Sequence, residues 1–255
     1  MLLIYRGWFM SRALRVACVV LFVLSIVAVV LCLPPIAQDA AYHDFGDKRP
    51  FFGVANFFDV ASNLLFIVFG AMGLCYVLPK KQAAEKWLWA TFFVGAILVG
   101  VGSGYYHLNP NNATLVWDRI PMTISFMSFF ALIIMQYINA RLGSILAPLL
   151  LLLGVGSVWY WNYTESLGQG DLRPYILVQF LPLLLIPCII WLSPTRSRSV
   201  KYLWFTLAWY AAAKVFEHYD KEFYALTGYM VSGHSIKHLA AAMGVSTMLL
   251  YAREK

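Results

Sequence analysis

The chain has 255 residues, of which 61% are hydrophobic and only 12% are charged, and its mean hydropathy is +0.70. A soluble domain carries about 25% charged residues, so this composition excludes a soluble fold and predicts an integral membrane protein. The formal net charge of +7 does not indicate a nucleic-acid partner, because Lys and Arg fall in short clusters between apolar runs.

The first apolar run, at about residues 17–36, follows three arginines. A cleaved signal peptide has an apolar core of only ~7–15 residues, so this longer run predicts a retained anchor helix. Residues 37–53 are polar and predict a loop outside the cell membrane. Seven further apolar runs follow, each near the ~20 residues that cross a bilayer. They lie at about 54–78, 87–106, 115–138, 145–161, 174–192, 200–218 and 233–251.

The predicted fold is therefore an all-α membrane protein, a bundle of seven transmembrane helices with one additional N-terminal transmembrane helix. We divide the chain into an anchor helix with its outside loop, residues 1–49, and a seven-helix domain, residues 50–255. Basic residues gather in alternate loops, which predicts that both termini are cytoplasmic. These residues are Arg6, Arg12, Arg15, Lys80, Lys81, Lys86, Arg141, Arg196, Arg198, Lys201, Arg253 and Lys255.

Three histidines stand at helical spacing inside these apolar runs. Ser103 and His107 are four residues apart, as are His234 and His238, so each pair shares one face of a helix. Three imidazoles with an open fourth position are typical of a catalytic zinc, and a nearby carboxylate, Asp118, could move protons. The predicted topology puts all of these residues near the non-cytoplasmic ends of their helices.

Three other interpretations use the same side chains. A bis-histidine haem would leave Asp118 unexplained. Ser103 could act as a covalent nucleophile with His107 as its base, but this leaves His234 and His238 without a role. A receptor-like or transport protein could keep a structural zinc in the same fold, although such a site is normally closed by four protein ligands and needs neither Asp118 nor Ser103.

The remaining polar residues of the spans carry weaker signals. Lys214 and Glu217, three residues apart, predict an ion pair within one helix, and they could also orient a ligand histidine or a polar group of the substrate. The polar cluster in segment 56–63 predicts helix capping and hydrogen bonds between helices, with a further role in holding a zinc ligand, for Ser62 in particular. Its members are Asn56, Asp59, Ser62 and Asn63. We expect the long side chain of Lys237 to extend to the membrane surface.

With these motifs, the chain resembles the alkaline ceramidase family and the wider superfamily of seven-helix membrane hydrolases, which also includes progestin and adiponectin receptor-like proteins. The resemblance runs from about residue 50 to the C-terminus. It is carried by Ser103-x-x-x-His107, Asp118, His234-x-x-x-His238 and the segment 54–64, which resembles the start of that family's first core helix.

The resemblance implies a zinc held by His107, His234 and His238, and hydrolysis of the amide of ceramide or a related N-acyl lipid to a sphingoid base and a fatty acid. Asp118 would exchange protons with water and the leaving amine, and Ser103 would hydrogen-bond the oxyanion. Asn56 stands where eukaryotic members have an acidic calcium ligand, so we do not expect calcium. The chain would be a bacterial-type member in the plasma (inner) membrane, with its active site on the non-cytoplasmic side.

Overall fold

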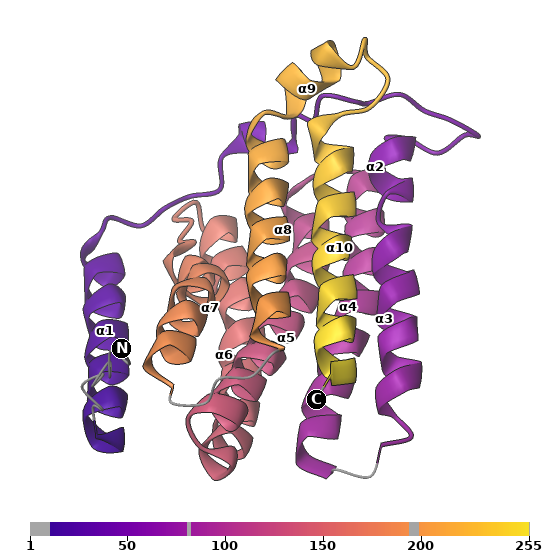
Figure 1. Ribbon diagram of the computed structural model, residues 1–255. Coiled ribbons are helices and arrows are strands. Elements are labelled where there is room, and N and C mark those ends of the chain that lie inside the picture. Colours follow the sequence, from indigo (N-terminus) through magenta and orange to yellow (C-terminus); the bar gives the residue numbers. More distant parts are fainter. Residues whose placement is uncertain (1–10, 81–82, 194–198, 255) are drawn as a thin grey trace, which may run out of the picture.

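The computed structural model describes residues 11–80, 83–193 and 199–254, and within them the chain is helical, with a single isolated β-bridge between Phe51 and Val54. The long helices stand side by side in one bundle, with α1 at its edge (Figure 1). In chain order the elements are α1 Arg12–Cys32, η1 Ala40–His43, α2 Phe57–Ala61, α3 Leu64–Val77, α4 Ala83–Leu108, α5 Asn112–Tyr137, α6 Ala140–Ser166, α7 Arg173–Leu192, α8 Val200–His218, α9 Asp220–Leu226 and α10 Gly233–Glu254.

Five of the described helical segments are long and apolar enough to cross a membrane, so the chain is a multi-pass membrane protein. A shorter apolar helix, Val16–Cys32, precedes them. Helices α8 and α10 are not among the five, so these candidates do not confirm the eight spans that the sequence predicted. The five are Phe57–Val77, Glu85–Leu108, Asn112–Tyr137, Ala140–Ser166 and Arg173–Leu192.

Several predicted boundaries were wrong by a few residues, for local reasons. Helix α1 ends at Cys32 instead of residue 36, because Pro34 and Pro35 follow and proline disfavours helical backbone at the residue before it. The predicted span 54–78 is interrupted at Ser62 and Asn63, where α2 gives way to α3. The short helices η1 and α9 were not predicted. Arg6, Lys81, Arg196, Arg198 and Lys255, which the orientation prediction used, lie outside the described residues.

The hydrophobic core fills the end of the bundle far from α9. Phe93 on α4, Ile133 on α5, Leu203 on α8 and Met248 on α10 are each at most 1% exposed and belong to one cluster. Helix α10 packs against α8 and α3, and α5 packs against α4, α6 and α7. This arrangement brings the end of α4, the start of α5 and the start of α10 to the same end of the molecule.

Candidate metal centre and active site

The three predicted histidines meet at one buried point. His107 lies in the last turn of α4, and His234 and His238 lie at the start of α10. Each is 1–3% exposed, and one ring nitrogen from each lies within 4.8 Å of the others. The Nε2 atoms of His107 and His234 are 3.3 Å apart. The four-residue spacing on α10 therefore does present both of its histidines to the single histidine of α4.

The start of α10 is held in place by two polar side chains and a glycine. The Ser232 hydroxyl accepts the Ser235 N–H at 3.0 Å, as a helix N-cap does, and the Asp220 carboxylate accepts the His234 N–H at 2.7 Å. A side chain at Gly233 would overlap the Phe216 carbonyl of α8. Glycine is needed here because α10 begins in direct contact with the end of α8.

The end of α4 is held by an unusual contact. Asn56 precedes α2 with φ +47°, in the left-handed region that asparagine tolerates better than most residues, and its side chain makes no capping bond. Instead its amide donates to the His107 carbonyl at 2.7 Å. Of the two roles predicted for segment 56–63, Asn56 therefore makes the hydrogen bond between helices and not the helix cap.

The donor set fits a metal ion. His107 Nδ1 and His238 Nε2 are buried without a hydrogen-bond partner among the described residues. The other nitrogen of His238, Nδ1, lies 2.8 Å from Ser62 Oγ, and that hydroxyl donates to the Asp59 carbonyl at 3.0 Å. His238 must then donate from Nδ1, which leaves its Nε2 lone pair free for a ligand bond.

Asp118 and Ser103 line the same cavity as His238. Asp118 on α5 is 8% exposed, Ser103 on α4 is 2% exposed, and their side chains interact. The two helices can approach this closely because residue 102 is glycine: a Cβ there would overlap the Trp117 carbonyl. A buried carboxylate and a buried hydroxyl therefore share a cavity with His238, one of the three imidazoles.

A cavity of about 470 Å³ runs from this group into the bundle. Ser103, Asp118 and His238 line one part of it, and aromatic and aliphatic side chains line most of the rest. A volume of this size suits a small or medium-sized ligand, and the apolar walls suit hydrocarbon chains.

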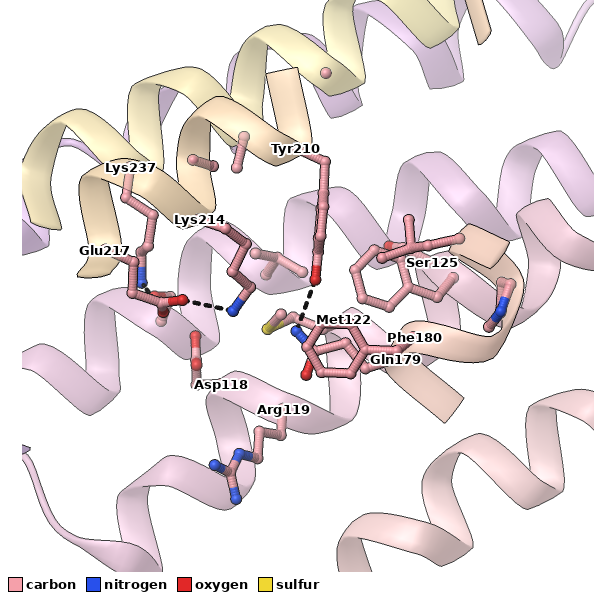
Figure 2. A pocket seen from close by; sticks show the side chains of 18 of the residues that line it. Asp118, Arg119, Met122, Ser125, Gln179, Phe180, Tyr210, Lys214, Glu217 and Lys237 are labelled. Carbon is pink, nitrogen blue, oxygen red and sulfur yellow. Dashed lines mark hydrogen bonds and ion pairs between the residues drawn. The ribbon is translucent and has the colours of Figure 1, made fainter. Parts of the chain in front are cut away.

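Two lysines and a glutamate enter the same cavity, as Figure 2 shows. The predicted ion pair within α8 is confirmed, with Lys214 Nζ 2.5 Å from Glu217 Oε2. The prediction that Lys237 extends to the surface was wrong. Its ammonium lies 3.6 Å from Glu217 Oε1 and 2.9 Å from His234 Nε2, because α8 offers a carboxylate on the face against which α10 packs.

Three further side chains complete the site, of which Phe45 and Arg119 were not identified from the sequence, whereas Asp59 belongs to the predicted polar cluster. Asp59, fully buried, accepts from the Ser235 hydroxyl at 2.6 Å and joins α2 to α10. The Phe45 ring covers the histidines from the loop before α2, with its centroid 4.2 Å from that of His234. Arg119 also lines the cavity. An ionisable residue inside a span is itself a signal of function, and this signal could have singled out Arg119.

Electrostatic contacts hold the covering loop over the site. Asp44 accepts hydrogen bonds from Lys221 and Lys48, and these contacts hold the pKa of its carboxyl at about 2, below the ordinary 3.8. Asp220 accepts the Gly46 N–H at 2.7 Å, with the same carboxylate that accepts the His234 N–H. Asp220 therefore connects the loop directly to a histidine of the site.

The fold and the site together define a multi-pass helical membrane protein with a buried three-histidine group that could hold a metal ion. The model of the Ceramidase family matches residues 52–253, so the chain belongs to that family. Membership makes the chain a membrane hydrolase that acts on amide bonds, and it confirms the resemblance found in the sequence. A comparison with curated proteins found no match.

Proposed function

We propose that the chain is a zinc-dependent intramembrane hydrolase that cleaves the amide bond of ceramide or a related N-acyl lipid, releasing a sphingoid base or another amine and a fatty acid. The observation that carries this proposal is a group of three buried histidines, one of which, His238, lines the same apolar cavity as Asp118 and Ser103. Family membership supports the amide bond as the target.

His107, His234 and His238 would hold the metal. Three imidazoles beside a carboxylate are a ligand set that suits zinc and leaves a position open for chemistry. When bound, such an ion supplies Lewis-acid polarisation of a carbonyl and lowers the pKa of water. Ser62 would keep His238 in the tautomer that binds metal, because its hydroxyl takes the Nδ1 proton as a hydrogen bond.

Asp118 and Ser103 would carry the proton and charge transfers. Asp118 would take a proton from the attacking water and return it to the amide nitrogen as the C–N bond breaks, so that one residue serves as base and then as acid. Ser103 would donate a hydrogen bond to the carbonyl oxygen, where negative charge develops. Both side chains are buried, so bulk water does not screen these interactions.

In the membrane we propose the seven-helix bundle, residues 50–255, with the anchor helix and outside loop, residues 1–49, as an addition. Helices α8 and α10 have 19 and 22 residues, or about 29 and 33 Å, which is enough to cross the hydrocarbon layer. Both termini would be cytoplasmic, and the site would face the non-cytoplasmic side of a bacterial plasma membrane. The lipid would be the partner, entering from the bilayer.

The test combines metal analysis with a lipid panel on the same purified samples. We expect one zinc per chain, lost in His234→Ala and His238→Ala but kept in His218→Ala, because His218 lies on an exposed part of α8. Unchanged zinc in both site variants would refute the metal assignment.

Asp118→Asn keeps the size of the side chain but cannot take a proton, so turnover of the preferred lipid should fall by ~10²–10⁴-fold while zinc stays bound. Ser103→Ala should lower turnover by about 10²–10³-fold. Ser128→Ala is the matched control, since the bonds of this buried serine within the described part of the chain go to carbonyls of its own helix. Wild-type turnover in both site variants would refute the mechanism.

A further inference from the structure

Arg119 is a buried cation with an unused donor. It follows Asp118 on α5, is 5% exposed and lines the cavity. Its Nη2 donates to the Gln38 side-chain oxygen at 2.6 Å, but its Nη1 is buried without a hydrogen-bond partner among the described residues. The ion pairs found in the described part of the chain do not include Arg119. A buried guanidinium N–H without an acceptor is costly, so a ligand acceptor is expected there.

Aromatic rings fix the guanidinium in place. Its Cζ lies 4.3 Å from the ring centroid of Trp161, 4.7 Å from that of Tyr175 and 5.6 Å from that of Tyr42. Ring faces attract a cation but do not accept its N–H bonds as an oxygen does. The donor edge is therefore held in position for an oxygen ligand, and the planar guanidinium matches the geometry of a carboxylate or a phosphate.

The other cations of the cavity are occupied. Lys214 and Lys237 both pair with Glu217, and in Figure 2 the Asp118 carboxylate lies on their side while the Arg119 guanidinium points away from them. Asp39, which also lines the cavity, is exposed and accepts the Ala41 N–H instead. Among the described basic side chains that line the cavity, Arg119 is thus the one without a carboxylate.

The position of Arg119 indicates which part of a lipid it meets. Gln38 and Tyr42 beside it belong to the loop that precedes the bundle domain, whereas Leu203 and Met248, which line the cavity elsewhere, belong to the apolar core. Acyl chains fit among the core residues. We then expect the polar head of the lipid toward Arg119, which follows Asp118 on α5.

We propose that Arg119 binds an oxyanion, a carboxylate or a phosphate, on the amine half of the amide lipid, and that it selects anionic N-acyl lipids over neutral ones. This inference rests on the proposed amide hydrolase. Among the amide lipids of the proposed function, it ranks those whose released amine carries a negative group above neutral ones such as ceramide.

The test measures binding, so that it does not depend on turnover. Full-length Asp118→Asn protein in a neutral detergent is titrated with N-palmitoylglycine and with N-palmitoylethanolamine, which share an acyl chain and differ mainly in charge. We expect the anionic lipid to bind about 10- to 100-fold more tightly, as hydrogen bonds to a charged partner do. Ceramide 1-phosphate against ceramide tests phosphate in the same way. Equal affinities for the anionic and the neutral lipid in both pairs would overturn the proposal, and this result needs no variant of Arg119.

In the Asp118→Asn protein, a second substitution Arg119→Gln should remove the preference for the anionic lipid, and Arg119→Lys should keep part of that preference. Arg141→Gln removes an exposed cation of α6 outside the cavity and should change nothing. Gln38→Ala removes the bond from the loop but keeps the charge, so it should also keep the preference, whereas a purely structural Arg119 would make Gln38→Ala behave like Arg119→Gln.

One further outcome would contradict the role of Arg119, and another would contradict the proposed hydrolase alone. If Arg119→Gln weakened binding of free palmitate and left the preference between the two amides intact, the residue would serve the product, and the proposal would be wrong. Release of palmitate by the wild-type protein is measured separately. Absence of release with Arg119-dependent binding would reject the hydrolase and keep the anion site.

Discussion

Asp220→Asn should weaken both the fold and the site, because one carboxylate accepts two backbone N–H groups. Its Oδ1 accepts from His234 and its Oδ2 from Gly46, each at 2.7 Å, and the side chain is buried. Asparagine keeps one acceptor and turns an NH2 group toward the second N–H. Loss of a hydrogen bond to a charged group costs about 1.5–3 kcal/mol.

For a chain of this size that cost corresponds to a fall of about 3 to 12 °C in the melting temperature. Tryptophan fluorescence of the purified protein in detergent measures it, and zinc affinity on the same samples should fall as His234 loses its support. Glu222→Gln is the matched control, an exposed carboxylate on the same short helix. A melting temperature within 1 °C of wild type in Asp220→Asn would refute the reasoning.

Three further predictions concern other contacts of the site. Ser62→Ala should lower zinc affinity by about 10- to 100-fold at unchanged stoichiometry, measured by chelator competition, because His238 loses its Nδ1 acceptor. Gly102→Ala should destabilise the protein by about 1–3 kcal/mol, because the new Cβ overlaps the Trp117 carbonyl. Gly104→Ala is the control and should not destabilise the protein, because the nearest atom to its Cβ is 4.0 Å away. Equal melting temperatures of the two variants would count against the close approach of α4 and α5. The Arg173 hydrogen bonds hold the pKa of Asp171 at about 2, below the ordinary 3.8, so the stability that Asp171 adds is present above pH ~4 and is lost as the pH falls through 2. The difference in melting temperature between wild type and Asp171→Asn should shrink over that range, and a constant difference would contradict the assignment.

The sequence by itself determined the medium, the helical class and the family. Apolar runs near 20 residues predict membrane helices, and helical periodicity predicts which residues share a face. This is why the pairing of Lys214 with Glu217 and the shared face of His234 and His238 could be predicted, since each lies within one helix. Boundaries were less certain, because the break between α2 and α3 has no proline or glycine to mark it.

Only the tertiary structure decided what each side chain meets across helices. Lys237 enters the cavity because Glu217 of α8 lies opposite, Asp220 supports both a loop and a histidine, and Arg119 keeps one donor free inside an aromatic box. Helical periodicity predicts in which direction a side chain leaves its own helix. It does not predict which residue of another helix lies in that direction. For a buried charge that neighbour decides everything, because the choice between an ion pair, a hydrogen bond and a ligand depends on which acceptor the packing supplies.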